Sequence, residues 1–382
     1  TTYHLKEFRW KLNPAEMYSR GEIKYLKPQI YSLPNNAPFQ DGDQVCARHY
    51  VYHGHGFNFS TGNNEDLAFE DITVYGCPGH AFVGYGNGRG FRLSRCKIMR
   101  RPHAVRLVSA TADGAHFGST RGDILIEDCD FSYQGDDSVN IHGTWLRVAD
   151  VYDLRQIALQ GKWANLQTFR AGDELKLCRA ENLEEYARLV VVAAETNRAA
   201  GVFRVTVDRD LPRGIVLGDY AANLNCASAR FVIRRNSFHD HRGRGILIQT
   251  RDGLVEDNRI SRVMGAGIQL TTDANFWQEG FGCENVIIRN NTIEECNYHL
   301  GWAFQPDSRA LAALNLMVDT ETGLGTYPVH RNVRIEGNTI KDTSGLAILA
   351  ASCSNVTIRN NLISDANRIP FGASGTAIQA AP

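Results

Sequence analysis

The sequence has no long apolar run and no excess of charge of either sign. No stretch of about 18 apolar residues occurs, so no membrane-spanning helix is expected. Lys and Arg number 41 and Asp and Glu number 42, which gives a net charge of −1. This balance provides no long-range attraction to nucleic acid or to an anionic membrane. A neutral or weakly charged substrate fits better, and no nucleic-acid partner is expected.

Paired cysteines and a visible targeting segment are also missing. The nine cysteines are an odd number and include no CxxC pair. Neither a disulfide framework nor a zinc site is therefore expected, and most of the thiols should be buried. No basic segment followed by an apolar one opens the chain, so the sequence shows no signal peptide.

What the sequence does contain is an internal repeat. Each copy has alternating apolar residues, two polar residues, an anchor residue, one variable residue, and usually Ile or Phe. The copies lie at 67–74, 91–98, 124–131, 231–238, 253–260, 286–293, 333–340 and 356–363. Their anchors are Asp71, Cys96, Cys129, Asn236, Asn258, Asn291, Asn338 and Asn361.

The spacing of the anchors predicts an all-β chain folded as a right-handed parallel β-helix. The shortest separations are 22 to 25 residues, the length of one coil with three short strands and three turns. Alternation points Ile, Val and Leu inward, and the recurrent Asn suggests a left-handed turn residue whose amides stack in a ladder. A leucine-rich repeat or a helical repeat would need a Leu signature or 3.6-residue periodicity, and neither is present.

One gap between anchors is much longer than a coil. Cys129 and Asn236 lie 107 residues apart, and the intervening stretch contains short alternating strands bounded by Gly, Pro and Asn. We therefore expect a small antiparallel β-barrel inserted into the β-helix. The expected domains are N-terminal coils with a capping segment at 1–143, the barrel at 144–225, and C-terminal coils at 226–382.

Stacking of the coils brings acidic residues from distant parts of the sequence together. When the third strands of successive coils are aligned, Asp113, Asp137, Arg244 and Ala266 fall in one column, with Asp136 beside Asp137. Neighbouring strands lie about 4.8 Å apart, so three carboxylates and an arginine should meet in one patch. Because such carboxylates repel one another, at least one of their pKa values should be raised.

A cluster of this kind suits hydrolysis of a glycosidic bond. One protonated carboxyl group gives a proton to the leaving oxygen while another deprotonates water. The spacing alone also allows aspartates that cap turns or bind a structural cation. Two other functions remain open: a polysaccharide lyase or C5-epimerase acting on a uronate polymer, and a non-catalytic carbohydrate-binding β-helix. A lyase would need a basic patch, whereas Arg244 is the one basic residue in this column.

Several nearby side chains are suited to sugar binding. Trp277, in a Gly-flanked loop, offers an indole face for the apolar side of a sugar, and acidic residues beside it could bind hydroxyl groups. Arg244 could clamp a hydroxyl or keep Asp137 ionised. Each has a structural alternative, such as a packed loop Trp or a neutralising Arg. The candidate substrate-binding residues are His116, Asn140, His142, Arg244, Asp273, Trp277 and Glu279.

Two strings around the aspartates resemble a known family. SATADGAHF at 109–117 and QGDDSVNIHG at 134–143 resemble glycoside hydrolase family 110, as do the segments 242–250, 273–280 and 329–338. The resemblance covers most of the chain and extends to the inserted barrel. That family is similar in fold to the family 28 polygalacturonases and consists of α-galactosidases that act on terminal α-1,3-linked galactose.

The resemblance implies an inverting exo-hydrolase without metal or cofactor, located in the periplasm or secreted. Its catalytic aspartates correspond to Asp113, Asp136 and Asp137. Our hypothesis gives Asp136 the general-acid role, while Asp113 and Asp137, on one side of the column, activate the water. For inversion the acid and base carboxyl groups should lie roughly 6.5–9.5 Å apart. The stretch 299–329 departs from the family pattern and could reshape a subsite.

Overall fold

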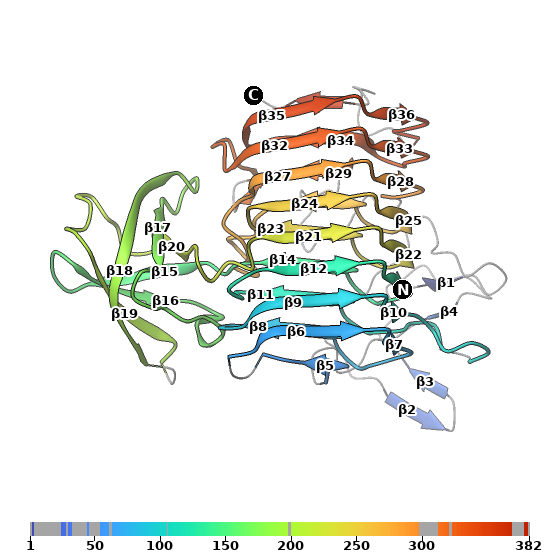
Figure 1. Ribbon diagram of the computed structural model, residues 1–382, viewed down its shortest axis with the longest axis horizontal. Coiled ribbons are helices and arrows are strands. Elements are labelled where there is room, and N and C mark those ends of the chain that lie inside the picture. Colours follow the sequence, from blue (N-terminus) through green and yellow to red (C-terminus); the bar gives the residue numbers. More distant parts are fainter. Residues whose placement is uncertain are drawn as a thin grey trace.

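The computed structural model describes residues 54–368 except for 61–62, 105, 198–199, 298–311 and 321–322, with the backbone of a few short strands elsewhere. Three parallel sheets stack coil upon coil into a parallel β-helix, as predicted (Figure 1). The expected capping segment lies largely outside the described residues. Only the paired strands β1 (Thr2–Tyr3) and β4 (Gln44–Val45), and β2 (Lys24–Lys27) and β3 (Ile30–Ser32), belong to it.

Each coil contributes one strand to each sheet. Sheet 1 contains β5 (Phe57–Asn58), β8 (Phe82–Tyr85), β11 (Ala115–Gly118), β14 (Val139–His142), β23 (Ile246–Gln249), β26 (Ile268–Leu270), β29 (Ala312–Leu316), β34 (Leu346–Ala350) and β37 (Ile378–Ala380). Sheet 2 contains β6 (Glu65–Glu70), β9 (Arg89–Ser94), β12 (Ile124–Glu127), β21 (Phe231–Arg234), β24 (Gly253–Glu256), β27 (Glu284–Arg289), β32 (His330–Glu336) and β35 (Cys353–Arg359). Sheet 3 contains β7 (Thr73–Val74), β10 (Lys97–Ile98), β13 (Asp130–Ser132), β22 (Ser237–His241), β25 (Arg259–Val263), β28 (Thr292–Glu294), β33 (Thr339–Lys341) and β36 (Leu362–Ser364).

The core runs through the middle of the coils. Alternating residues of each strand point inward, so that Phe117, Ile141 and Ile248 of sheet 1 are fully buried in one apolar cluster with residues of the other two sheets. The residues between them lie on the outer face of sheet 1. Because every coil repeats the same register, outer-face side chains from successive coils lie one strand spacing apart.

The anchor positions form the predicted ladder of amides. The backbone N–H and Nδ2 of Asn258 donate to Oδ1 of Asn291 at 3.1 and 2.9 Å, and Asn291 donates in the same way to Asn338 at 2.9 and 3.0 Å. Asn236 and Asn361 continue the ladder at either end. Each amide thereby satisfies buried backbone donors of the coil before it.

Two details of the repeat were predicted wrongly. The left-handed residue precedes the anchor: φ is positive at Arg235 and Asp257, but not at the asparagines that follow them. The Asn side chain replaces the missing backbone partner at this corner, so it does not itself need the left-handed conformation. The first anchor is also shifted by one residue. Lys97 pairs with Thr73, so Ile72 occupies the anchor position that was assigned to Asp71.

The inserted domain is a closed antiparallel barrel. In order around the barrel its strands are β15 (Leu146–Val151), β16 (Gln156–Gln160), β19 (Val202–Val207), β18 (Glu185–Asn197), β17 (Glu174–Cys178) and β20 (Tyr220–Asn223). A short 3-10 helix, η1 (Ala164–Leu166), also belongs to it. The barrel projects from one side of the β-helix beside β14 (Figure 1). Its strands fall within the predicted range of 144–225, while the domain limits themselves stay predictions.

The junction between barrel and β-helix is closely packed. The fully buried Trp145 donates from Nε1 to Oγ1 of Thr272 at 2.8 Å and packs against Tyr220 and Phe281. The predicted 299–329 insertion contains the short hairpin of β30 (Asp319–Thr320) and β31 (Gly323–Leu324), and its residues 299–311 and 321–322 lie outside the described residues.

The remaining compositional predictions can be compared with the described residues. Seven of the eight cysteines in this part of the chain are buried free thiols, as expected, and Cys353 is half-buried. This part of the chain also contains no helix with the length and apolar character needed to cross a membrane.

Candidate active site

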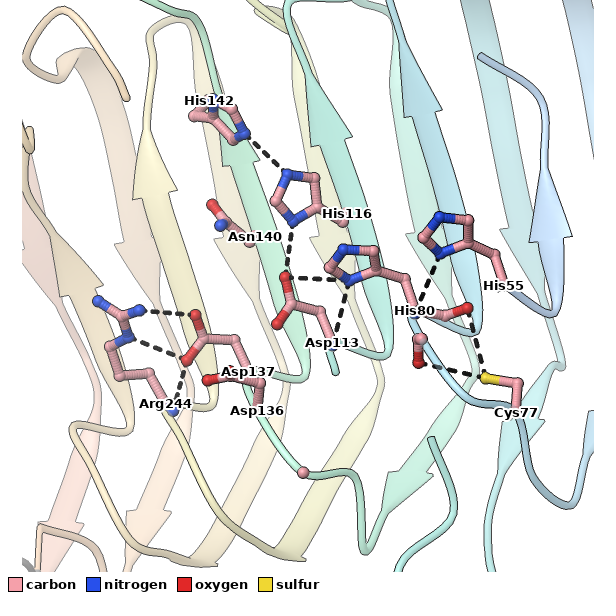
Figure 2. Close-up of polar contacts among 12 residues, drawn as sticks. His55, Cys77, His80, Asp113, His116, Asp136, Asp137, Asn140, His142 and Arg244 are labelled. Carbon is pink, nitrogen blue, oxygen red and sulfur yellow. Dashed lines mark hydrogen bonds and ion pairs between the residues drawn. The ribbon is translucent and has the colours of Figure 1, made fainter. Parts of the chain in front are cut away.

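The predicted column of aspartates is present on sheet 1. Ala115 pairs with Val139, which pairs with Ile246, so Asp113, Asp137 and Arg244 hold equivalent positions two residues earlier. The N–H of Gly114 donates to the Asp137 carbonyl at 2.9 Å, which fixes this register at the start of the strands. Figure 2 shows the side chains of Asp113 and Asp137 side by side, with Asp136 next to Asp137.

The three carboxyl groups are closer together than we expected. One oxygen each from Asp113, Asp136 and Asp137 lie within 4.8 Å of one another. These nearest oxygens are thus closer than the roughly 6.5–9.5 Å expected between the two carboxyl groups of an inverting enzyme, and that separation stays a prediction. The cause is the architecture: Asp136 and Asp137 are adjacent in sequence, and Asp113 lies one coil away. Such close carboxyl groups approach the roughly 5 Å of a retaining pair, although here there are three.

Arginines face two of the three aspartates. Nε of Arg244 donates to Oδ1 of Asp137 at 2.9 Å, and a terminal nitrogen of Arg244 donates to Oδ2 at 2.8 Å (Figure 2). Its backbone N–H donates to the same Oδ1 at 2.7 Å. Arg242 lies 3.3 Å from Oδ1 of Asp136. Two of the three carboxyl groups therefore have a positive counter-charge, whereas the neighbours of Asp113 are histidines.

Burial and mutual repulsion perturb the carboxyl groups in the predicted direction. Burial raises the pKa of Asp113 well above its usual range, and the charges of Asp137 and Asp136 raise it further. Burial also raises the pKa of Asp137, while Arg244 opposes the shift. The side chains of Asp113 and Asp137 are 8% and 2% exposed, whereas that of Asp136 is 17% exposed. A substrate would therefore reach this set from the side of Asp136.

The two predicted histidines form a chain that begins at Asp113. Nδ1 of His116 lies 2.6 Å from Oδ2 of Asp113, and its Nε2 lies 2.8 Å from Nε2 of His142. Nδ1 of His142 in turn lies 2.5 Å from the carbonyl oxygen of Gly143. All four ring nitrogens therefore have partners within the protein. This arrangement favours a supporting role for both histidines over the direct sugar binding that we predicted.

Glu279 lies on the other side of His142. Its Oε2 accepts hydrogen bonds from Nδ2 of Asn140 at 3.4 Å and Nε2 of Gln249 at 2.8 Å, while its Oε1 lies 3.7 Å from Nε2 of His142. Oδ1 of Asn140 and Oε1 of Gln249 are buried without a hydrogen-bond partner. Buried acceptors in this state are costly, so they are suited to receive hydroxyl groups of a ligand.

The backbone of Asp273 pairs with that of Glu279, and the side chains of Asp273 and Trp277 make contacts of their own. Asp273 accepts hydrogen bonds from the backbone N–H groups of Asn275 and Phe276 at 3.1 and 2.7 Å. The ammonium group of Lys162 lies over the Trp277 ring, 4.8 Å from its centroid. One face of the indole is therefore covered, and Asp273 supports its own loop. Both residues stay predictions as sugar ligands, but these contacts favour structural roles.

Sequence reasoning missed His80, which adjoins the aspartate column. Its Nδ1 accepts a hydrogen bond from the Asp113 backbone N–H at 3.2 Å and lies 3.5 Å from Asp113 Oδ2. Burial lowers the pKa of His80 to about 3, so the ring is neutral. The signal was available: Phe82 pairs with Ala115, so extending the column by one coil places His80 next to Asp113.

Metal-ligand geometry occurs only within this site among the described residues. Three overlapping sets have ligand atoms within 4.8 Å of one another. They are His80, Asp113 and His116; His116, His142 and Glu279; and Asp113, Asp136 and Asp137. The sets share Asp113 and His116. An ion bound by one set would therefore disturb the hydrogen bonds that these residues make in another set.

Comparison with known proteins agrees with this description. A family model described as a right-handed beta helix region matches residues 220–381. An α-1,3-galactosidase A from Bacteroides fragilis is 31% identical over 372 residues, which cover 94% of this chain and 58% of that protein. An α-1,3-galactosidase B from Akkermansia muciniphila is 27% identical over 300 residues, 78% of this chain and 37% of that protein.

Among solved structures, the A-module of a mannuronan C-5 epimerase from Azotobacter vinelandii aligns with a TM-score of 0.45 and 12% identity, covering 83% of this chain and 58% of that one. So weak a likeness favours none of the candidate functions. The chain is a right-handed parallel β-helix with an inserted barrel, and the resemblance to glycoside hydrolase family 110 is confirmed. It spans about half the length of the curated relatives that it matches, at 58% and 37% of the two above.

Proposed function

We propose that this chain is the hydrolytic part of an exo-acting α-galactosidase that removes terminal α-1,3-linked galactose with inversion. The observation that carries the proposal is the convergence of Asp113, Asp136 and Asp137 within 4.8 Å on successive coils. Similarity to proteins named α-1,3-galactosidase over 94% of the chain supports the choice of sugar. Both arginines at the site face aspartates, an arrangement that a uronate-binding lyase would not need.

The proposed roles follow from exposure and charge. Asp136, the most exposed of the three, gives a proton to the glycosidic oxygen. Asp113 and Asp137 hold the attacking water between them. Two oxygens up to 4.8 Å apart can both accept hydrogen bonds from one water at about 2.8 Å each. Three clustered carboxyl groups can thus serve an inverting reaction, whereas only two carboxyl groups at the same distance would favour retention.

The residues beside the aspartates provide the proposed galactose seat. Asn140 and Gln249 offer unpartnered buried oxygens, and Glu279 adds a carboxylate whose position they fix. We further propose that the protein acts in the periplasm or outside the cell, where glycans with terminal galactose occur. Fractionation of the source cells tests that location.

Replacement of the aspartates tests the proposed function. In Asp113→Asn, Asp136→Asn and Asp137→Asn variants, release of galactose from an α-1,3-galactoside should fall by roughly 10²- to 10⁴-fold each. The panel of substrates should include linear and fucose-branched α-1,3-galactosides. A matched control is Asp150→Asn, an exposed aspartate on the barrel. Wild-type turnover by all three variants would indicate a non-catalytic binding protein, and an unsaturated product absorbing in the ultraviolet would indicate a lyase.

A further inference from the structure

The hydrogen bonds between His116 and His142 determine where their protons lie. The Gly143 carbonyl oxygen only accepts, so Nδ1 of His142, 2.5 Å away, carries a proton. If His142 is neutral, its Nε2 is bare and accepts from Nε2–H of His116 at 2.8 Å. Nδ1 of a neutral His116 is then bare as well. Its partner at 2.6 Å, Oδ2 of Asp113, must therefore carry the proton of that hydrogen bond.

His80 leads to the same result from another coil. The Asp113 backbone N–H donates to Nδ1 of His80 at 3.2 Å, so this nitrogen is bare too. It lies 3.5 Å from Oδ2 of Asp113. Two bare ring nitrogens from different coils thus face one carboxyl oxygen. A carboxylate there would face two ring nitrogens that carry no proton, whereas a protonated oxygen can donate to the nearer one, Nδ1 of His116 at 2.6 Å.

Charge balance assigns the proton to the same place. Arg242 and Arg244 face Asp136 and Asp137, at 3.3 and 2.8 Å, and offset the charges of these two carboxylates. Asp113 has no hydrogen bond or ion pair with an arginine or lysine among the described residues, and the charge of Arg244 opposes the rise of its pKa only as the last of the causes. Burial and the charges of Asp137 and Asp136 raise the pKa of Asp113, while burial lowers that of His116. The groups facing the chain are His55, His80, Tyr85, Asp136, Asp137, Arg244 and Glu279.

We propose that Asp113, His116, His142 and the Gly143 carbonyl form a proton store that keeps one proton on Asp113 in the free protein. His116 and His142 are then positioning residues that act through Asp113. This part of the proposal rests on the proposed function: the store also explains how Asp136, the general acid, regains a proton for each turnover. When substrate binds, the Asp113 O–H bond breaks and an O–H bond forms on Asp136, within 4.8 Å. Asp136 then gives this proton to the leaving oxygen. Water attack breaks an O–H bond of the water and forms one on the now ionised Asp113, which refills the store.

Ring nitrogen NMR of the substrate-free protein tests the store without reference to activity. The protein has 12 histidines, and spectra of ¹⁵N-histidine-labelled His116→Gln and His142→Gln variants assign the two relevant rings. Near neutral pH we expect a proton on Nε2 alone for His116 and on Nδ1 alone for His142. A proton on Nδ1 of His116, or a doubly protonated His142, would place the proton elsewhere and overturn the proposal. Ring signals that change on addition of a chelator would show a metal ion between the rings instead.

The pH profile of kcat/KM tests the consequence for catalysis. In His142→Met the acceptor for His116 Nε2 is lost, so His116 can take the other tautomer and donate to an ionised Asp113. The carboxyl set then binds its proton less tightly, and the basic limb should move to lower pH by at least about one unit. His142→Gln, which keeps an acceptor, should restore the limb, and His239→Gln on sheet 3 is the matched control. A raised KM with an unmoved basic limb would show that His142 binds sugar and would overturn the proposal.

Discussion

At the scale of single residues, the most informative contact is the clamp of Arg244 on Asp137. Both side-chain oxygens and a backbone N–H take part, at distances of 2.7 to 2.9 Å. The clamp opposes the burial that raises the pKa of Asp137. We infer that it keeps this carboxyl group ionised, so that Asp137 can accept a hydrogen bond from the attacking water.

Arg244→Met should therefore move the acid limb of kcat/KM. Without the guanidinium the pKa of Asp137 rises, so the ionised form is reached only at higher pH. The limb should shift upward by roughly one to three units, and the folded state should lose about 3–5 kcal/mol because a buried charge loses its partner. pH-rate measurements and denaturant unfolding check both effects. Arg234→Met, which breaks an ion pair with Glu127 on sheet 2, should leave the acid limb unmoved.

The sequence predicted the aspartate column but not all its neighbours. Asp113, Asp137 and Arg244 were found because backbone register alone decides which of them align. The roles of His116 and His142 were harder to predict, because they depend on which ring nitrogen meets which neighbour. His80 belongs to a coil whose strand had not been aligned. Side-chain direction and loop packing, as at Trp277, are tertiary properties that a one-dimensional pattern does not contain.

At the scale of the structural elements, the asparagine ladder connects one coil to the next. Asn291 accepts two hydrogen bonds from Asn258 and donates to Asn338. Asn291→Ala should lower the free energy of unfolding by roughly 2–4 kcal/mol, because buried donors of Asn258 lose their acceptor. Guanidinium unfolding of this variant measures the loss. Asn165→Ala, at an exposed position of the barrel, should change stability little. Equal losses in the two variants would show that the asparagine ladder does not stabilise the β-helix.

Sheet 3 contains an ion-pair cluster that should make stability depend on pH. Burial alone would lower the pKa of His239, but hydrogen bonds to Asp130 and Asp240 outweigh it and raise the pKa to about 9. In the unfolded chain the ring titrates near 6.5. Its stabilising contribution is thus fully present below about pH 6.5 and is lost as pH rises through about 9.

The free energy of unfolding should therefore decline between pH 6.5 and 9, and His239→Gln should flatten this decline. Denaturant titrations at several pH values measure it. The variant should be less stable than the parent at pH 6 and closer to it at pH 9.5. A constant difference across that range would show that His239 stabilises by packing and not through its charge.

The repeat shows how far local pattern predicts an element. Period-two alternation and the anchor spacing were enough for the coils, because each coil must bury the same face against the next. The first anchor was misassigned because Asp71 is polar and Ile72 is not, although pairing of Lys97 with Thr73 sets the register. The left-handed residue was misplaced by one for a similar reason: an Asn suits that conformation, but here its amide serves the ladder.

At the scale of the whole molecule, the barrel and the β-helix meet beside the site. Trp145 leads into the barrel and contacts both Thr272 and Phe281, which flank the loop carrying Glu279. Nε1 of Trp163 also donates to the Trp277 carbonyl at 2.8 Å. The barrel therefore supports the loop from which Glu279 reaches Asn140 and Gln249. Its insertion directly after the histidine chain is consistent with such a role.

Trp145→Ala should lower both stability and activity. The cavity should cost about 3–5 kcal/mol, and displacement of the loop should reduce kcat/KM through Glu279. Thermal unfolding and steady-state kinetics below the melting temperature separate the two effects. Leu154→Ala, at a barrel position that is 71% exposed, serves as the control. Unchanged kcat/KM in a destabilised Trp145→Ala protein would show that the barrel does not support the site.

The central claim is that aspartates stacked on successive coils add a single water to a galactoside from the face opposite the leaving group. Proton NMR of the first sugar released from an α-1,3-galactoside tests it most directly. The account predicts that β-galactose appears first and then mutarotates. α-Galactose as the first product would contradict it, since the close carboxyl groups would then act as the acid and nucleophile of a retaining enzyme.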